Sequence, residues 1–160
     1  MTETMTLFDN EVDYRTAADL TLAAAKREIR IFDRDLERLE LDARAHISLL
    51  SSFLAGGRDR HLRIVLHDTG PLERHQARLV TLIRQHTHTV EVRRTPEHLR
   101  HLTDSWILAD QKYGTIRFHD DHARGKSIAG SAAEVRPWWQ RFDEVWEASE
   151  VCSPGAATGL

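Results

Sequence analysis

The chain has 160 residues, of which 41% are hydrophobic and 29% are charged, and its net charge is -3 at pH 7. No apolar run approaches the roughly 20 residues that a membrane-spanning helix needs, and the acidic start lacks the basic and apolar regions of a signal peptide. The single cysteine, Cys152, excludes a disulfide framework and a cysteine-based metal site. We therefore expect one soluble, cytoplasmic domain with no membrane partner.

The predicted elements are helices that alternate with strands, each identified by the spacing of its apolar residues. Residues 1–15 are expected to form a loosely held leader, and Thr16 then caps an alanine-rich helix. In chain order, the elements that follow are a strand over 28–32, a charged and exposed stretch over 33–40, a helix from Asp42 to the Gly56-Gly57 stop, a strand over 61–68, a helix from Gly70-Pro71 and a strand over 87–93.

The last third of the chain predicts a strand pair and then the most regular helix. Residues 105–109 and 113–118 are typical of two strands joined by a tight turn. The apolar residues of the final helix recur at i, i+3, i+4 and i+7, namely Val135, Trp138, Trp139, Phe142, Val145 and Trp146. We interpret this face as core; base stacking by the adjacent tryptophans and a dimer surface are the alternatives. Residues 150–160 are expected to be a disordered tail.

The order of these elements indicates an α/β fold. Helices of about 12 residues between short strands favour a layered domain, and we predict one domain over residues 16–149 with a mixed, mainly parallel sheet flanked by helices. Ligands of such sheets bind at the carboxyl ends of the strands. The segment 54–101 is locally basic, with nine arginines against five acidic residues, which indicates either an anion-binding face or a solvated mixed surface.

The polar run His119-Asp120-Asp121-His122 follows the predicted strand pair. Its side chains are of metal-ligand types, but neighbouring residues cannot all converge on one ion. The alternative is a polar loop in which aspartates cap turns, and we expect neither a metal nor a cofactor. Arg124, Lys126 and Ser127 lie just beyond and are candidates for holding an anion. The chain has no nucleophile elbow, no phosphate-binding loop and no dinucleotide fingerprint.

Two stretches resemble the phospholipase D superfamily. ARAHISLLSSFLAGGRDRHLRIVLHD, over 43–68, resembles that family's helix and following strand, and SWILADQKYGTIRF, over 105–118, resembles the strand-turn-strand that carries its HxKxxxxD signature. The final helix, with Phe142 and Trp146, also suits the family, so the resemblance covers residues 16–149. Because family enzymes need two signature copies, the resemblance implies that this chain is one half of a homodimer.

The signature positions of this chain depart from the family's pattern. Asp110 matches the closing aspartate, but Thr103 and Ser105 replace the histidine that attacks phosphorus and the lysine that balances the oxyanion charge. Asp120 stands near the family's asparagine, and Arg117-Phe118-His119 replaces the small residues before it. The resemblance implies that Asp110 braces the turn and that the Thr103–Ser105 strands of a dimer face each other across a cleft.

These departures favour a non-catalytic function. We expect a binding or scaffolding module for a phosphate-bearing ligand, a nucleic acid or a protein partner, with Arg117, Arg124 and Lys126 as the anion contacts. The alternative is a divergent phosphodiesterase or other hydrolase with a relocated nucleophile or base. Its candidate residues are His119 or His122, oriented by Asp120 or Asp121.

Overall fold

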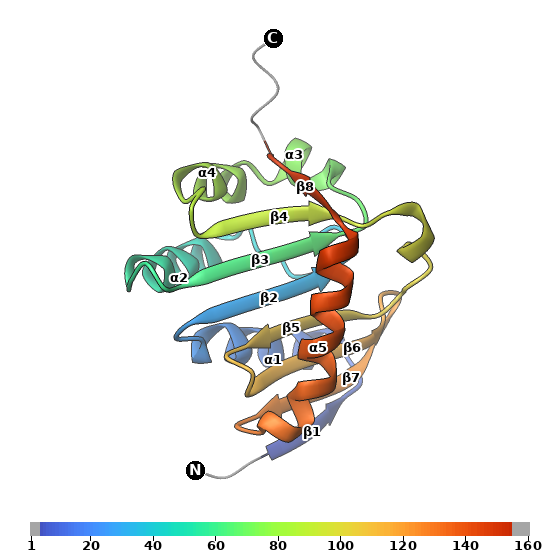
Figure 1. Ribbon diagram of the computed structural model, residues 1–160. Coiled ribbons are helices and arrows are strands. Elements are labelled where there is room, and N and C mark those ends of the chain that lie inside the picture. The colour runs from blue at the N-terminus through green and yellow to red at the C-terminus, as the bar shows by residue number, and fades with distance from the viewer. Residues whose placement is uncertain (1–3, 155–160) are drawn as a thin grey trace.

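The computed structural model describes residues 4–154, which build one sheet with helices on both faces (Figure 1). Its strands are β1 (Thr4–Phe8), β2 (Glu28–Asp33), β3 (His61–Leu66), β4 (Val90–Arg94), β5 (Ser105–Ala109), β6 (Tyr113–His119), β7 (His122–Ala129) and β8 (Glu150–Cys152). Its helices are α1 (Glu11–Ala24), α2 (Arg44–Ala55), α3 (Gly70–His75), α4 (Ala77–Gln85) and α5 (Ala132–Ala148), with a 3-10 turn over Glu97–Leu99. None of the helices within residues 4–154 is long and apolar enough to cross a membrane.

The sheet is mixed but mostly antiparallel, so the prediction of a mainly parallel sheet is wrong. Its eight strands follow the order β1-β7-β6-β5-β2-β3-β4-β8. The β2–β3 and β3–β4 pairs are parallel, whereas the other five described pairs are antiparallel. The physical reason is the length of the connections, because short turns join β5, β6 and β7, while parallel neighbours need a crossover such as α2 or α3–α4.

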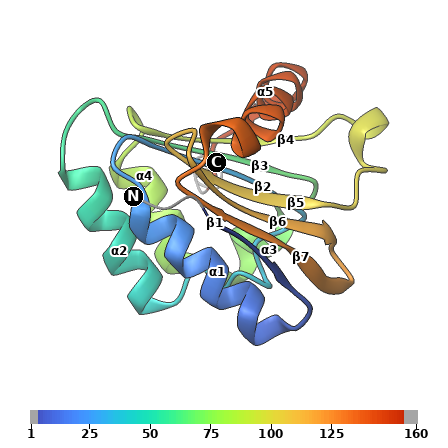
Figure 2. The same cartoon turned by 90° about the horizontal axis from the view of Figure 1, so that it is seen from below.

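The sheet separates two hydrophobic cores (Figure 2). Helices α1, α2 and α4 cover one face, and α5 crosses the other. Side chains of a strand point alternately to the two faces. Ile31 and Ile107 therefore pack toward α1, α2 and α4, while Phe32 and Trp106 pack beneath α5. All four are buried, as expected for strands covered on both sides.

The N-terminal segment belongs to the fold, so the leader expected over residues 1–15 is wrong for every residue that the structure describes. β1 pairs antiparallel with β7 at one edge of the sheet. α1 begins at Glu11, five residues before Thr16, because Asn10 is its cap. The Asn10 side-chain oxygen accepts a hydrogen bond from the Asp13 amide at 2.8 Å. The first three residues lie outside the described part of the chain.

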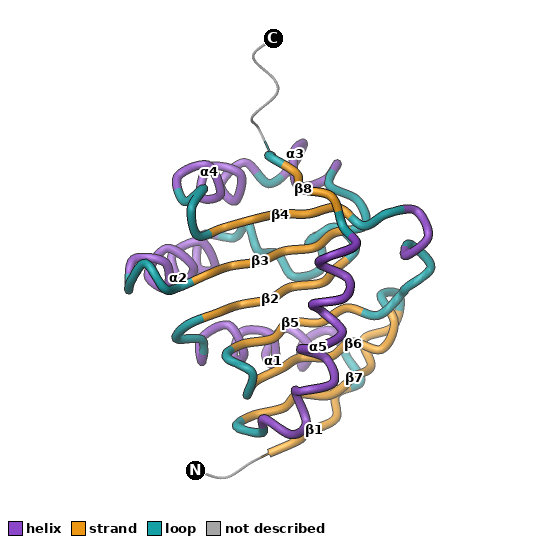
Figure 3. Tube along the Cα trace, in the orientation of Figure 1, coloured by secondary structure: helices purple, strands orange, loops and turns teal. Residues whose placement is uncertain are grey.

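The opposite end of the chain also adds a strand. β8 pairs antiparallel with β4 at the far edge of the sheet (Figure 3), so the disordered tail expected over 150–160 is wrong for residues 150–152. Residues 155–160 lie outside the described range, and the expectation stays untested there. α5 begins where Ser131 accepts a hydrogen bond from the Glu134 amide at 3.3 Å.

β7 was not predicted, because few of its residues are buried and the strand therefore lacks an alternating apolar pattern in the sequence. Of its residues, Gly125 and Ile128 are buried. A Cβ at Gly125 would overlap the Ile116 carbonyl oxygen and press against the Phe8 ring. Glycine is therefore required where β7 lies between β6 and β1. Because glycine is unfavourable within strands, its presence in the sequence does not indicate a strand.

Candidate functional site

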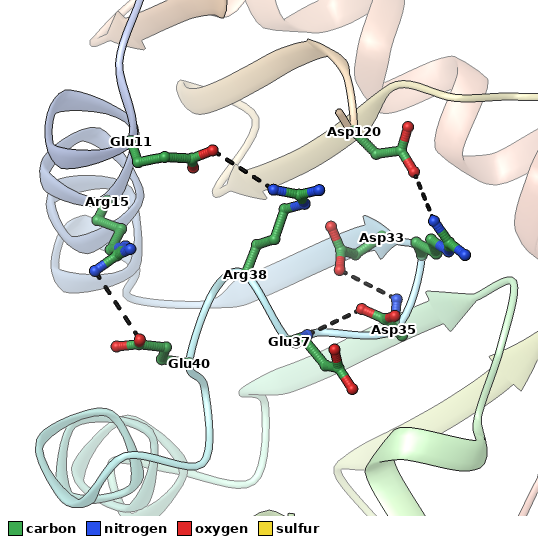
Figure 4. Close-up of a pocket in the computed structure, with 9 residues that line it drawn as sticks. Glu11, Arg15, Asp33, Asp35, Glu37, Arg38, Glu40 and Asp120 are labelled. Atoms are coloured by element: carbon green, nitrogen blue, oxygen red, sulfur yellow. Dashed lines mark hydrogen bonds and ion pairs between the residues drawn. The ribbon is translucent and has the colours of Figure 1, made fainter. Parts of the chain in front are cut away.

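A cavity of about 500 Å³ opens at the carboxyl end of β2 (Figure 4). Asp33 lies at the end of this strand, and side chains of the following loop, residues 34–40, form one wall. Glu11 and Arg15 from the start of α1 and Asp120 from the turn between β6 and β7 complete the lining. The cavity thus gathers segments from both halves of the chain at the edge of the sheet where α/β folds bind ligands.

Arginines of the cavity wall are engaged in ion pairs. Arg38 contacts Glu11 at 3.6 Å, and it also contacts Asp121 at 3.7 Å. Arg34 contacts Asp120 at 3.4 Å. These contacts tie the loop after β2 to α1 and to the β6–β7 turn (Figure 4).

Two further contacts hold the loop to the helices. Arg15 contacts Glu40 at 3.9 Å. His46 lies 2.7 Å from the Asp19 carboxylate and 2.8 Å from the Glu40 carbonyl oxygen. Both of these neighbours are acceptors, so the ring binds best in its doubly protonated form. Burial alone would lower the pKa of His46, but the hydrogen bonds to Asp19 and Glu40 outweigh burial and raise it.

Asp33 forms the floor of the cavity. Asp33 is 6% exposed. Its Oδ2 accepts hydrogen bonds from the Leu36 amide at 2.7 Å and from the Asp35 amide at 3.3 Å. Leu36 reaches this position with a φ of 71°, which a bulky side chain seldom adopts. Burial raises the pKa of Asp33, and the two amide bonds only partly oppose this effect.

One of the two altered signature positions, Ser105, lies beside Asp33. Ser105 is 4% exposed, and its hydroxyl has no hydrogen-bond partner within the described residues. It is nevertheless close enough to Tyr14 and Asp33 to favour their charged forms slightly. Burial dominates at Tyr14 and raises the pKa of its phenol well above the usual range. Thr103 is exposed, and its carbonyl oxygen accepts a hydrogen bond from the Asp120 amide at 2.7 Å.

Asp110 lies at the other end of β5, away from the cavity. With a φ of 55°, it follows the last residue of the strand. Its carboxylate accepts hydrogen bonds from the amides of Lys26, Arg27 and Glu28 at 2.7, 2.9 and 2.9 Å. This signature position therefore braces the start of β2 and takes no part in the cavity.

Arg117 is buried and its donors are taken. The residue is 1% exposed, and its two terminal nitrogens donate to the Glu11 carboxylate at 2.7 and 3.0 Å. It also donates to the carbonyl oxygens of His119 and Asp120 at 3.1 and 2.9 Å, and its guanidinium lies 4.7 Å from the centre of the Tyr14 ring. The hydrogen bond from Arg117 lowers the pKa of Glu11. The geometry leaves little capacity for an external anion.

The predicted anion contacts do not converge. Arg117 points to the face of the sheet that carries α1, as its bond to Glu11 shows. Lys126 points to the opposite face, where its ammonium lies 5.7 Å from the centre of the Trp138 ring. Arg124 has the same strand parity as Lys126 and is exposed. Their joint role in binding an anion stays a prediction, and the fold does not favour a site shared by all three.

The His119-Asp120-Asp121-His122 run forms the end of the β6–β7 hairpin. His119 Nδ1 lies 3.3 Å from Asp120 Oδ1 and accepts a hydrogen bond from the Asp121 amide at 3.1 Å. The His119 and His122 rings are 5.4 Å apart. Ligand atoms of the first three residues lie within 4.8 Å of one another, but Arg34 and Arg38 already pair with the two aspartates. A metal ion would therefore compete with these two arginines for the same carboxylate groups.

Two other polar residues near the strand ends are used structurally. His67 lies 2.7 Å from both the Thr95 hydroxyl and the Leu102 carbonyl oxygen. Because the carbonyl can only accept, Nε2 carries the proton, and burial lowers the pKa of this ring. Asp68 accepts a hydrogen bond from the Gly70 amide at 2.9 Å. Within the described residues, neither belongs to the group of metal-type ligands formed by His119, Asp120 and Asp121.

Sequence reasoning missed the residues that dominate the cavity. The stretch 33–40 was expected to be exposed because it is so highly charged. Leu36, Leu39 and Leu41 are in fact buried, and these leucines were the available signal that the segment packs against the core. Glu11 fell within the predicted leader, and nothing near it in the sequence indicates a partner 106 residues away.

The comparisons with known proteins agree with this fold. Residues 11–154 match a family model described as "Domain of unknown function (DUF7931)". A search of the curated proteins finds no match.

Solved structures similar to the chain include Nuc, a phospholipase D family member from Salmonella typhimurium. It has 13% identity and a TM-score of 0.65, with 94% of this chain and 99% of Nuc covered. NucT from Helicobacter pylori has 10% identity and a TM-score of 0.64, with 94% and 100% covered. The archaeal chromatin protein TrmBL2 has 14% identity and a TM-score of 0.66, with 92% of this chain but 54% of TrmBL2 covered. The chain therefore has a phospholipase D-like fold.

Proposed function

Because the chain belongs to the DUF7931 family and has a phospholipase D-like fold, we propose that it is a non-catalytic phospholipase D-like domain that acts as a binding module. The observation that carries this proposal is the pair Thr103 and Ser105 at the positions of the signature's histidine and lysine. A threonine hydroxyl without a general base is a poor nucleophile at neutral pH, and serine carries no positive charge for an oxyanion.

The surroundings of these positions support the same conclusion. Ser105 lies in a buried space beside Asp33 and Tyr14, and a second carboxylate, Glu11, is held next to Arg117. A phosphodiester is an anion, so carboxylates around the site repel it. The arginine that might offset this repulsion is committed to Glu11. The altered signature position Ser105 thus has neighbours that disfavour an anionic substrate.

A phosphodiesterase assay tests the proposal. The chain is expected to release no nitrophenol from bis(p-nitrophenyl) phosphate above the rate of the buffer, with or without added Mg²⁺. Hydrolysis that scales with protein concentration and survives repurification would overturn the proposal.

A divergent hydrolase is the second candidate, and the His119–Asp120 contact favours it. His119 Nδ1 lies 3.3 Å from Asp120 Oδ1, so this carboxylate can orient the ring once Nδ1 carries a proton and no longer accepts from the Asp121 amide. If the assay shows activity, His119→Ala should abolish it while His98→Ala, on the separate 3-10 turn, should not. Activity that is unchanged in His119→Ala and in His122→Ala would sink this candidate.

We propose that the module is a homodimer, as the resemblance implies. A single chain carries one copy of the degenerate signature, and Thr103 is exposed two residues before β5 begins, where a second copy can approach it. Light scattering after size-exclusion chromatography should give twice the mass of 18.4 kDa, and a crosslink between Thr103→Cys positions should form across the pair. A mass of one chain at all accessible concentrations would contradict this arrangement.

Nucleic acid is one partner to test, because TrmBL2, whose structure is similar to this chain, is an archaeal chromatin protein that binds DNA. The exposed Arg124 and the neighbouring Lys126 on β7 are the candidate contacts. Binding to a DNA duplex, measured by fluorescence anisotropy, should weaken steeply with salt and weaken further in Arg124→Gln but not in the control Lys26→Gln. A flat salt response, or no binding at low salt, removes nucleic acid as a partner.

A further inference from the structure

The helix α5 covers only part of its face of the sheet. Where β1, β7 and β6 lie side by side, Lys126 pairs with Leu7 on one side and with Ile116 on the other. Residues that pair directly point to the same face, and Ile116 is buried in the core beneath α5. Leu7 is nevertheless 75% exposed, and the end of the β6–β7 hairpin extends past the helix (Figure 1). An open strip of sheet surface therefore lies beside α5.

Two aromatic rings reach solvent at this open strip. Phe118 lies two residues after Ile116 on β6, so it points to the same face, and it is 50% exposed. Trp138 on α5 is partly exposed. The other three tryptophans of the chain are buried, namely Trp106, Trp139 and Trp146. Because soluble domains expose few contiguous apolar groups, Phe118, Trp138 and Leu7 together mark this strip as an interaction surface.

Two cationic side chains without carboxylate partners lie beside the rings. The Lys126 ammonium is 5.7 Å from the centre of the Trp138 ring. Arg124 precedes Lys126 by two residues on β7, the strand that pairs with the one carrying Phe118. Two residues of a strand span about 7 Å. Within residues 4–154, neither Arg124 nor Lys126 forms an ion pair, so both charges are available to an anion.

The combination of rings and cations fits a single strand of nucleic acid. Aromatic side chains on an open sheet surface stack on unpaired bases, while neighbouring cations bind phosphates. A duplex keeps its bases stacked inside, so it offers phosphates but no free base faces. A broad anionic surface, such as a membrane of acidic lipids, would also meet the exposed carboxylates of α5, which belong to Glu134, Glu144 and Glu147. A narrow strand can lie between α5 and β1 and avoid this repulsion.

We propose that this open strip binds single-stranded nucleic acid, with bases stacked on Phe118 and Trp138 and phosphates held by Arg124 and Lys126. This inference rests on the proposed function, because the module binds the strand without cleaving it. The surface is separate from the altered signature. Ser105 lies two residues before Ile107 on β5 and shares its face, which is the face that packs toward α1.

Fluorescence anisotropy of the full chain with a labelled oligothymidylate, at low salt and in EDTA, tests the proposal. The single strand should bind about tenfold more tightly than a duplex of the same length, as expected from one stacked base. Phe118→Ala should remove this preference, and Phe118→Tyr should retain it. Leu20→Ala removes an exposed apolar side chain from α1 on the other face of the sheet, and it should leave the affinity within about twofold.

Salt dependence and tryptophan emission report on the phosphate contacts and the stacking separately. Two phosphate contacts on a single strand predict a slope of about -1.4 for the logarithm of affinity against that of salt concentration, and Lys126→Gln should reduce its magnitude by about 0.7. Stacking on Trp138 should quench tryptophan emission as the oligonucleotide is added. Trp138→Phe should lose this quenching and keep the affinity within about threefold, because a phenylalanine ring still stacks.

The outcomes that overturn this inference are distinct from those that overturn the proposed function. No binding of oligothymidylate at low salt, or equal weakening by Phe118→Ala and Leu20→Ala, would refute the site. Equal affinity for single strand and duplex without quenching would show attraction to phosphate alone and refute stacking. Anionic lipid vesicles that displace the oligonucleotide and depend on Phe118 would replace nucleic acid with a membrane surface. Hydrolysis of bis(p-nitrophenyl) phosphate would refute the non-catalytic function, whether or not the oligonucleotide binds.

Discussion

The pairing of Arg117 with Glu11 should dominate the local stability of the cavity wall. Replacing Glu11 with alanine leaves a guanidinium that is 1% exposed with two backbone carbonyls as its remaining partners. Breaking a fully buried ion pair from one side destabilises a protein by about 3–5 kcal/mol. The Glu11 side chain is 40% exposed, and solvent screens part of the interaction, so we expect about 2 kcal/mol. Arg117→Met should cost less than Glu11→Ala, because it removes the buried charge itself.

Urea unfolding followed by circular dichroism measures this effect. A double-mutant cycle over Glu11→Ala and Arg117→Met should give a coupling energy of about 1–2 kcal/mol, whereas the exposed Glu147→Ala should change stability by less than about 0.5 kcal/mol. The pKa of Glu11 is lowered in the fold, so its contribution is present above its unfolded value of 4.5 and is lost as the pH falls through the folded value. A Glu11→Ala variant as stable as Glu147→Ala at pH 7 would refute the reasoning.

Three further predictions follow from single side chains. The raised pKa of Asp33 means that ionisation of this carboxyl destabilises the fold as pH rises above about 4. Asp33→Asn, whose oxygen can still accept from the amides, should be more stable at pH 7 and should lose less stability between pH 4 and 7, as measured by urea unfolding. An unchanged pH dependence of stability would contradict this. The pKa of His46, measured by NMR titration, should lie above 6.5 and fall in Asp19→Asn, and its stabilising contribution should be lost as pH rises through the folded value. An unshifted pKa would contradict a stabilising interaction of His46 with Asp19. Gly125→Ala should destabilise the chain by about 2–3 kcal/mol, a loss of roughly 5–10 °C in Tm by calorimetry, because the added Cβ overlaps Ile116. A Tm within about 2 °C of wild type would show that β6 moves to accommodate the added methyl group.

The sequence predicted the strands that are buried on both faces better than it predicted their neighbours. β2, β3, β5 and β6 were placed within a few residues, because apolar residues such as Ile31 and Ile107 recur with a strand's period. The period of apolar residues does not indicate whether a strand runs parallel or antiparallel to its neighbour. The antiparallel pairing of β5 with β2 could therefore not be predicted. β1 was missed because four of its five residues are exposed, which gives a surface-like sequence to an edge strand.

The candidate site was less predictable, because it depends on contacts between distant segments. The signature positions Thr103, Ser105 and Asp110 could be assigned through the resemblance to the phospholipase D superfamily. Their separation to opposite ends of β5 was anticipated in part, since Asp110 was expected to brace a turn. The role of Arg117 was obscured, because a free anion contact and a buried arginine paired with Glu11 look the same in a sequence.

The Arg117–Glu11 pair also limits the order in which its two residues can be replaced. A change of Arg117 to a small residue leaves a void beside Tyr14 and a carboxylate without its partner. Changing Glu11 first leaves the buried Arg117 guanidinium without its carboxylate partner. Either order of replacement therefore passes through an intermediate that is less stable than the paired state. The two residues are expected to be replaced together or retained together, and this coupling links α1 to β6 in any redesign of the cavity wall.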